Sequence, residues 1–257
     1  MAKKQKQLYI VAKGYRPGLY STWSGRGGAA EQVQGFPGAV YRGFHTREEG
    51  AAWLAGLEEG LLSELPPDVQ ALLEQATAAD QDEGIASLLE AGVVVIHTDG
   101  GAIDNPGPGG YGVVLRYKGQ RRELSGGFRS TTNNRMELLA CIEGLKALKH
   151  ACRVVVYSDS RYVVDSMTKG HAKRWQADGW KLSKRRKAEN VDLWEQLLAL
   201  CGQHDVEFRW VRGHAGNPDN ERCDQLAMAA ASRTNLPPDA AFEEGKTQEA
   251  SATLFSM

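Results

Sequence analysis

Four acidic residues stand out, because each lies where a strand is predicted to end or a helix to begin. They are Asp99, Glu137, Asp159 and Asp224. Asp99 and Asp159 each follow an apolar run, at residues 93–96 and 154–157, so neighbouring strands would bring both acids to one sheet edge. Two like charges about 4 Å apart repel by roughly 4 kcal/mol at an effective dielectric of about 20. Protons or divalent cations must neutralise such a cluster, and hard cations with oxygen ligands favour metal-assisted phosphodiester cleavage.

Each acid taken singly also has an ordinary structural role. A strand-terminal Asp commonly caps the next helix, which fits Asp159. An acid in the first turn of a helix is favoured by the helix dipole, which fits Glu137 and Asp224. The joint pattern favours a metal centre over these separate roles.

A histidine adds to the pattern. His214 lies in a loop with two glycines, just before the predicted helix that carries Asp224. Histidine titrates near neutral pH, so His214 could shuttle protons or assist product release beside a metal cluster. The alternative, a solvated loop histidine, stays open.

Composition bounds the class of protein. The 257 residues are 42% hydrophobic and 25% charged, which is ordinary for a soluble globular protein of one large or two small domains. The net charge is only -1, but residues 48–115 contain no Lys or Arg, whereas residues 2–47 and 169–187 are strongly basic. Such segregation favours localised contact with a polyanion.

Cysteine usage and hydropathy indicate the compartment. The four cysteines are scattered without a CxxC pair, which favours free thiols in a reducing environment. No apolar run approaches the roughly 20 residues needed to span a bilayer, and the basic N-terminus lacks an apolar segment of signal-peptide length. We therefore expect a cytoplasmic protein without membrane contact, and a monomer.

Changes in composition divide the chain into four predicted segments. They are a small module at 7–57, an acidic, partly helical linker at 58–92, a large α/β domain at 93–235 and a disordered tail at 236–257. In the module we predict strands at 8–11 and 39–44 and a helix at 46–57 that begins at Thr46.

The large domain shows five strand patterns and four helix patterns. The strands are predicted at 93–98, 111–118, 121–129, 153–158 and 206–211, and the helices at 134–149, 160–169, 191–202 and 220–232. Tight turns join the first three strands into a meander, whereas the later strands alternate with helices and would pair in parallel.

A glycine-rich stretch at 107–112 matches the pattern GxGxxG. That motif binds dinucleotides only where it follows a strand and opens a helix. Here Pro108 lies inside it, and residues 111–117 alternate like a strand. We interpret the stretch as a glycine-rich turn between strands.

Two segments combine cations with aromatic residues, a common recipe for nucleic-acid binding. Within residues 169–187 the candidates are Lys173, Arg174, Trp175, Trp180 and Lys181. In the small module they are Tyr9, Trp23, Tyr41 and Arg42. The alternatives are a solvated charged face for the first segment and aromatic core residues for the second.

Six motifs occur in order along the large domain. They are TDGG at 98–101, NPGPGGYG at 105–112, TNNRMEL at 132–138, SDS at 158–160, WVRGHAGNP at 210–218 and NERCD at 220–224. In order and spacing, residues 93–232 resemble ribonuclease HI. Residues 8–54 resemble the hybrid-binding, viroplasmin-like module that precedes this nuclease in many members, through Tyr9, Gly14, Pro17-Gly18, Thr22-Trp23, Gln32-Val33, Phe36 and Tyr41.

The resemblance implies a mixed five-stranded sheet ordered 3-2-1-4-5 and endonucleolytic cleavage of the RNA strand of RNA–DNA hybrids. It implies two Mg²⁺ ions, which Mn²⁺ could replace. Asp99 would bridge both ions, Glu137 and Asp159 would hold the one on the leaving-group side, and Asp224 the other. His214 would assist water delivery or product departure.

The resemblance also implies substrate contacts. Asn105, Asn133 and Asn134 would contact the RNA strand and Thr132 a DNA phosphate, while residues 169–187 would correspond to the basic protrusion that grips the DNA strand. Two departures from the family pattern concern the substrate surfaces. Gly170 and His171 occupy an area where the family often has a tryptophan, and residues 24–28 form an apparent insertion after Trp23.

Three other functions are compatible with parts of the pattern, of which an interaction scaffold built on the acidic linker ranks last. Another two-metal nuclease of the same fold would cleave plain duplex DNA. A non-catalytic hybrid-binding protein would bind without Mg²⁺-dependent products, although the complete set of four carboxylates argues against it.

Overall fold

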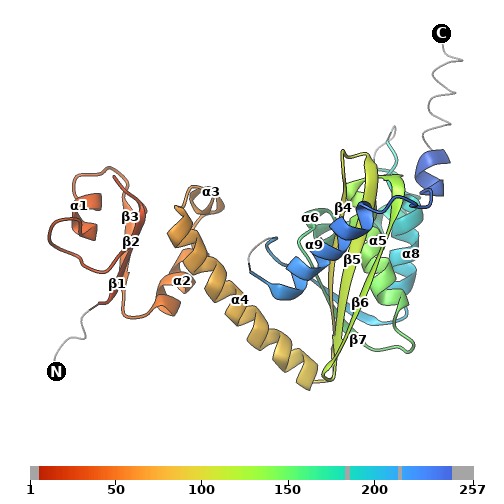
Figure 1. Cartoon of the computed structure of the whole chain (residues 1–257), viewed down its shortest axis with the longest axis horizontal. Coiled ribbons are helices and arrows are strands. Elements are labelled where there is room, and N and C mark those ends of the chain that lie inside the picture. Colours follow the sequence, from red (N-terminus) through yellow and green to blue (C-terminus); the bar gives the residue numbers. More distant parts are fainter. Residues whose placement is uncertain (1–5, 183–185, 214–215, 245–257) are drawn as a thin grey trace, which may run out of the picture. The chain divides into compact units, whose positions relative to one another are not determined.

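The computed structural model describes residues 6–182, 186–213 and 216–244. Contacts divide the chain into two compact units, Met1–Gly84 and Ile85–Met257 (Figure 1). No helix in the described part is both long and apolar enough to cross a membrane.

The first unit is built on a three-stranded antiparallel sheet with the order β2-β1-β3. Its elements are β1 (Leu8–Lys13), β2 (Gly18–Tyr20), α1 (Ala29–Val33), β3 (Val40–Phe44), α2 (Arg47–Ala55) and α3 (Glu59–Leu62). The Oγ1 atom of Thr46 accepts the Glu49 N–H at 3.2 Å, which confirms the predicted start of α2. The short β2 and α1 were not predicted, because neither carries a full period of apolar residues.

The segment expected to be a partly helical linker contributes to both cores. Helix α4 (Pro67–Glu90) is continuous over 24 residues. Val69 and Leu72 are buried in the core of the first unit, and the Asp68 carboxylate accepts the Leu19 N–H at 3.0 Å. Ile85, at the other end of α4, is buried in a cluster of the second unit. The proposed four-segment division stays a prediction, and a boundary at residue 57 leaves out part of the first core.

The second unit contains a five-stranded sheet. Its strands are β4 (Val94–Ala102), β5 (Gly107–Tyr117), β6 (Gln120–Thr131), β7 (Arg153–Ser158) and β8 (Asp205–Trp210). The order β6-β5-β4-β7-β8 confirms the predicted 3-2-1-4-5 arrangement. The first three strands pair antiparallel, whereas β7 lies parallel to both β4 and β8.

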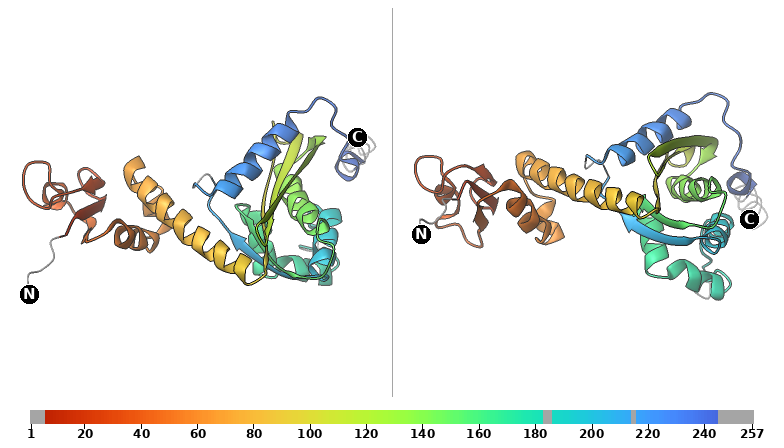
Figure 2. Two further views of the ribbon diagram at one scale, coloured as in Figure 1. Left: turned by 60° about the horizontal axis from the view of Figure 1, so that its bottom comes forward. Right: turned by 90° about the horizontal axis from the view of Figure 1, so that it is seen from below.

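Helices cover both faces of this sheet. They are α5 (Asn133–Lys146), α6 (Arg161–Thr168), α7 (His171–Ala177), α8 (Val191–Cys201) and α9 (Pro218–Ala231). Four of them confirm predicted helices, while α7 falls within the stretch that we interpreted only as basic. Figures 1 and 2 show α9 on one face and α5 with α8 on the other.

The glycines of β5 allow the helices to approach this closely. A Cβ atom on Gly109 would lie 3.0 Å from the Met136 side chain of α5. On the opposite face, Cβ atoms on Gly110 and Gly112 would collide with backbone atoms of α9 at Ala227 and Cys223. The GxGxxG stretch therefore belongs to a packed strand and opens no helix, which excludes a dinucleotide-binding motif. The interpretation as a turn is also wrong, because all four glycines lie within β5.

The C-terminal tail is partly ordered, which corrects the expectation of disorder for residues 236–244. Asp239 is only 3% exposed, and its carboxylate accepts two N–H groups of buried Arg135, at 2.6 and 2.8 Å. The Arg129 N–H donates to the Pro237 carbonyl at 2.9 Å. Residues 245–257, the rest of the predicted tail, lie outside the described residues.

A buried histidine makes stability depend on pH. His97 in β4 is fully buried, and its ring stacks on Tyr157 at 4.9 Å. Burial lowers the pKa of His97 to about 4, with Arg116 and Arg121 adding to the effect and Asp219 opposing it. The folded protein therefore keeps His97 neutral at a pH where the unfolded chain binds a proton.

We expect the stability contributed by neutral His97 to be complete above about pH 6.5 and to fall as pH drops toward 4, by up to about 3 kcal/mol. The variant His97→Gln, which has no titrating ring, should show a flatter dependence of unfolding free energy on pH. Urea titrations of both proteins between pH 4 and 7 measure this difference. Parallel curves would show that His97 does not contribute to the acid sensitivity.

Candidate active site

Parallel strand pairing brings the first two acids together. Thr98 of β4 is in register with Ser158 of β7, so Asp99 and Asp159, the next residue of each segment, lie side by side where the pairing of these two strands ends. This is the arrangement predicted from the two apolar runs. Asp159 directly follows β7, whereas Asp99 lies inside β4, which continues to Ala102 and beyond the predicted end at residue 98.

The third acid arrives on helix α5. A Cβ atom on Gly100 would lie 2.5 Å from the backbone nitrogen of Glu137, so only glycine at position 100 allows the helix to pack this close to β4. The Oγ1 atom of Thr132 caps the helix by accepting the Arg135 N–H at 3.4 Å. The first turns of α5 therefore place Glu137 against Gly100, the residue that follows Asp99.

One carboxylate oxygen from each of Asp99, Glu137 and Asp159 lies within 4.8 Å of the other two, and all three residues are half-buried. The Oε2 atom of Glu137 is buried without a hydrogen-bond partner. Burial raises the pKa of Glu137 well above its usual range, and the charges of Asp99 and Asp159 raise it further. The cluster is therefore short of positive charge.

These residues fit a divalent metal ion. Three carboxylates at this spacing offer the oxygen ligands that hard cations prefer. The Oε2 atom of Glu137, which is buried without a hydrogen-bond partner, can serve as one of these ligands. The Gly100 N–H donates to Oδ1 of Asp99 at 2.7 Å and fixes that carboxylate.

Asp159 is held from several sides. The Nδ2 group of Asn220 donates to its Oδ2 at 3.3 Å, and the indole N–H of Trp210 donates to its backbone carbonyl at 3.0 Å. A Cβ atom on Gly213 would lie 2.5 Å from the same Oδ2, so this glycine leaves room for the carboxylate. Sequence reasoning gave Asn220 no role, although its place four residues before Asp224, on the same face of a helix, was a usable signal.

The fourth predicted acid stands apart from this cluster. Asp224 is half-buried on α9 and is not among the three acids within 4.8 Å of one another. A Cβ atom on Gly112 would collide with the carbonyl of Cys223, and Gly112 pairs with Asp99 in the sheet. The backbone next to Asp224 therefore packs on Gly112, the residue of β5 that pairs with Asp99. Three of the four predicted acids form the cluster, and Asp224 is not part of it. His214, the predicted proton shuttle, lies outside the described residues.

The residues predicted to contact RNA cluster around the start of α5. Asn105 Oδ1 accepts the Asn133 N–H at 3.2 Å, and Asn133 Oδ1 accepts the Ala102 N–H at 2.7 Å. Asn105, Thr132 and Asn134 line a common groove of about 520 Å³. The structure therefore brings all four predicted polar contacts to one surface next to Glu137.

Only some of the residues predicted to form the basic surface are exposed. Lys173, Arg174 and Lys181 are exposed. Trp180, in contrast, is only 9% exposed and donates its indole N–H to Glu195 at 3.0 Å, so the prediction that it contacts substrate is wrong. Trp175 is half-buried and packs edge-to-face on a core tryptophan, 5.9 Å between ring centroids. The sequence pattern did not reveal that these tryptophans are buried, because tryptophans interleaved with cations are compatible with a hydrophobic core as well as with a nucleic-acid-binding surface.

In the first unit the predicted aromatic residues do come together. The Trp23 ring lies 5.5 Å from both the Tyr9 and the Tyr41 ring. These three residues and Arg42 line a shallow site of about 430 Å³. Trp23 and Tyr41 are partly exposed, as a surface that stacks on bases requires.

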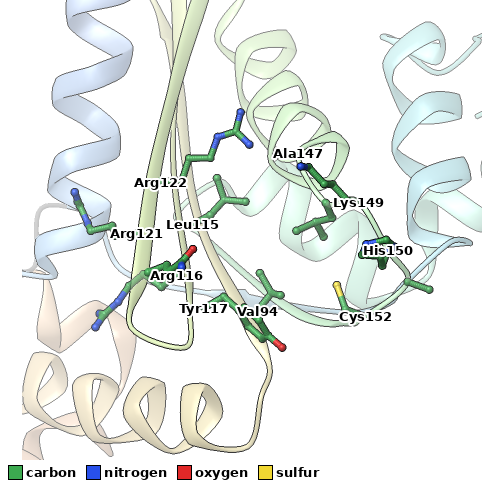
Figure 3. Close-up of a pocket in the computed structure, with 13 residues that line it drawn as sticks. Val94, Leu115, Arg116, Tyr117, Arg121, Arg122, Ala147, Lys149, His150 and Cys152 are labelled. Atoms are coloured by element: carbon green, nitrogen blue, oxygen red, sulfur yellow. The ribbon is translucent and has the colours of Figure 1, made fainter.

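Another pocket of the described surface has a different character (Figure 3). It has a volume of about 500 Å³ and lies at the strand ends away from the acids, where β4 begins at Val94. Its rim carries Arg116, Arg121, Arg122 and Lys149, and no carboxylate lines it. It therefore takes no part in the metal-binding geometry.

Comparison with known proteins decides the family. Residues 91–232 match the family model described as RNase H, and residues 7–54 match that of the ribonuclease H1 N-terminal domain. The chain belongs to the ribonuclease H family. The match over 91–232 covers the whole five-stranded sheet and the three clustered acids.

Several named relatives are similar to this ribonuclease H. The chain is 62% identical over 146 residues to a ribonuclease H of Desulforamulus reducens, covering 57% of this chain and 92% of the relative. It is 54% identical over 138 residues to a ribonuclease HI of Synechocystis sp., covering 53% and 86%. Among solved structures, LC9-RNase H1, described as a type 1 RNase H with the type 2 active-site motif, superimposes with a TM-score of 0.51 at 36% identity, over 56% of this chain and 74% of that one.

The electrostatics of the acid cluster give a testable expectation. Because the pKa of Glu137 is raised in the folded state, metal-free protein should lose stability as pH rises above the ordinary value of 4.5. The variant Glu137→Gln removes the charge, so at pH 8 in chelator its Tm should exceed that of the wild type by roughly 3–6 °C. The difference should vanish near pH 4, where both side chains are neutral.

Thermal melts in chelator and in Mg²⁺ measure this effect. Mg²⁺ should raise the Tm of the wild type at pH 8 and have little effect on Glu137→Gln. As a matched control, Glu143→Gln changes another acid of α5, paired with Lys146, and should leave the response to Mg²⁺ intact. A Glu137→Gln protein less stable than the wild type in chelator at pH 8 would contradict the proposed repulsion.

Proposed function

We propose that this ribonuclease H hydrolyses the RNA strand of RNA–DNA hybrids endonucleolytically, giving 5′-phosphomonoesters, at the cluster formed by Asp99, Glu137 and Asp159. The observation that carries the proposal is the convergence of these acids within 4.8 Å, with one buried oxygen of Glu137 lacking a partner. Membership in the ribonuclease H family supports the reaction and the substrate class.

We further propose that the site uses two Mg²⁺ ions, which Mn²⁺ could replace. Asp99, Glu137 and Asp159 would supply ligands, with Asp224 completing the set from α9. When bound, such ions stabilise the attacking and leaving oxygens of a phosphodiester displacement. The chain itself fixes its ligands beforehand, through Asn220 on Asp159 and the Gly100 N–H on Asp99.

Substrate selection falls to the residues around the start of α5. A ribonuclease H must detect 2′-hydroxyl groups on one strand and accept their absence on the other. Asn105, Asn133 and Asn134 are exposed, and their amides can donate to and accept from ribose hydroxyls and base edges in the wide minor groove. Lys173, Arg174 and Lys181 would attract the backbone of the DNA strand.

The first unit would increase affinity for the same substrate. Tyr9, Trp23 and Tyr41 form a partly exposed aromatic row with Arg42 beside it, which suits stacking against bases or sugars and pairing with a phosphate. A tethered second binding unit raises the effective concentration of substrate near the acid cluster. Free cysteines at all four positions support a reducing, cytoplasmic location, and we propose that the protein acts as a monomer.

One assay tests the reaction. Labelled RNA–DNA hybrid, duplex RNA, duplex DNA and duplex DNA with one embedded ribonucleotide are incubated with and without Mg²⁺, and the cuts are mapped. We expect Mg²⁺-dependent cuts within the RNA strand of the hybrid, each leaving a 5′-phosphate. Cleavage of plain duplex DNA would favour another nuclease of this fold, and binding without products would favour a non-catalytic hybrid-binding protein.

The variant Asp159→Asn should lower cleavage at least about 1000-fold, because the amide removes a charged ligand from the cluster. Hybrid binding should survive, since the surfaces around α5 and Trp23 are unchanged. The control Asp165→Asn alters a partly exposed acid of α6 that pairs with Lys169 and should cleave normally. Loss of binding with retained cleavage in Asp159→Asn would contradict the assignment.

The variant Trp23→Ala should weaken hybrid binding about 10-fold, because stacking on one aromatic ring contributes about 1–3 kcal/mol. Turnover at saturating substrate should not change. Tyr15→Ala is the matched control, since Tyr15 is an exposed aromatic residue of the same unit that packs on Phe36 instead. Titration of labelled hybrid against each protein measures the effect, and equal affinities would remove the first unit from hybrid recognition.

A further inference from the structure

The C-terminal segment 237–243, which we call the strap, contributes to the groove that holds the predicted substrate contacts. Ala241 and Phe242 line the same space of about 520 Å³ as Asn105, Thr132 and Asn134. Nothing in the sequence motifs pointed to these residues, because they follow the last motif and lie in a stretch without clear periodicity.

Buried interactions fix the strap in this position. Asp239 accepts the Thr131 hydroxyl at 2.8 Å in addition to the two N–H groups of Arg135. Arg129 adds a two-point ion pair to Glu243, at 3.0 and 2.6 Å. Because Asp239 is nearly inaccessible, its contacts with Thr131 and Arg135 hold the strap more firmly than the exposed pair of Arg129 with Glu243 could.

The groove carries no net positive charge. Arg135 is the one cationic residue among those that line it, and its guanidinium donates to Asp192 at 2.9 and 2.8 Å as well as to Asp239. Glu189 and Asp192 also line the groove. Net positive charge therefore cannot account for binding of a nucleic-acid strand here, and neutral donors and contact area must supply the affinity.

We propose that the strap is a substrate-binding element, in which Phe242 contacts the deoxyribose of the DNA strand, next to the DNA phosphate that Thr132 would bind according to the resemblance to ribonuclease HI. The inference rests on the proposed function. A deoxyribose presents no 2′-hydroxyl, so an apolar ring can cover it at no cost in hydrogen bonding. A ribose at the same place would have its hydroxyl buried against the ring without a partner, which is unfavourable. Phe242 therefore makes the enzyme select DNA on the strand that is not cut.

Steady-state kinetics of the full-length protein on RNA–DNA hybrid test the role of Phe242. We expect Phe242→Ala to raise KM about five- to tenfold and to change kcat less than twofold, since the ring contributes binding area away from the acids. Phe242→Leu keeps an apolar wall and should stay within about twofold of the wild type. Tyr117→Ala, an exposed aromatic at the far end of β5, is the control and should match the wild type.

Salt dependence separates this contact from the basic surface. The slope of log KM against log salt should be the same for Phe242→Ala and the wild type, because no charge is lost. Lys173→Gln should instead reduce the slope by about one counterion. A Phe242→Ala protein with an altered slope would overturn the neutral contact that we assign.

A second measurement does not depend on the variant folding well. Hybrids are prepared with a single ribonucleotide at each successive position of the DNA strand and tested on the wild type. One position should raise KM about five- to tenfold, and Phe242→Leu should reduce that penalty by at least half. If no position is sensitive, or if Phe242→Leu and Phe242→Ala both leave KM and the penalty unchanged, the inference fails. A wild type that cleaves no hybrid at all would instead refute the proposed function.

Discussion

Repulsion among three carboxylates is the constraint on which the structure of the second unit depends. Asp99, Glu137 and Asp159 come within 4.8 Å of one another, and Glu137 has its pKa raised by burial and by both neighbours. Nothing within the cluster stabilises this arrangement. The surrounding fold must hold it, through the parallel pairing of β4 with β7 and the close packing of α5 on β4. A cation bound among these acids would offset this repulsion.

Close backbone approach is the means by which the sheet and helices hold the site. Gly100 brings α5 against β4, and Gly110 and Gly112 bring α9 against β5. At each of these places a single methyl group would push a helix away and, with it, an acidic residue. Precision at the site therefore depends on residues that carry no chemistry of their own.

The surfaces proposed to bind nucleic acid differ in the physical interactions that they offer. The exposed cations of the α7 region would provide long-range attraction that salt weakens, whereas the groove beside α5 has no net positive charge and would depend on hydrogen bonds and contact area. The aromatic row of the first unit would add stacking. By this proposal affinity comes from charge and stacking, and discrimination between ribose and deoxyribose comes from the groove beside α5.

The strands, most helices and the place of Asp99, Glu137 and Asp159 could be predicted from the sequence, because they follow from local periodicity and from motifs that each occupy a few consecutive residues. The sheet order was implied by the resemblance of those motifs to ribonuclease HI. Only packing between distant segments shows that Trp180 is buried, that Asn220 supports Asp159 and that Asp239 holds the tail against Arg135. Such contacts join residues up to 104 positions apart, and nothing in the neighbourhood of either partner encodes the other. Local patterns set what each segment can form, whereas packing between distant segments decides which side chains remain available to a substrate.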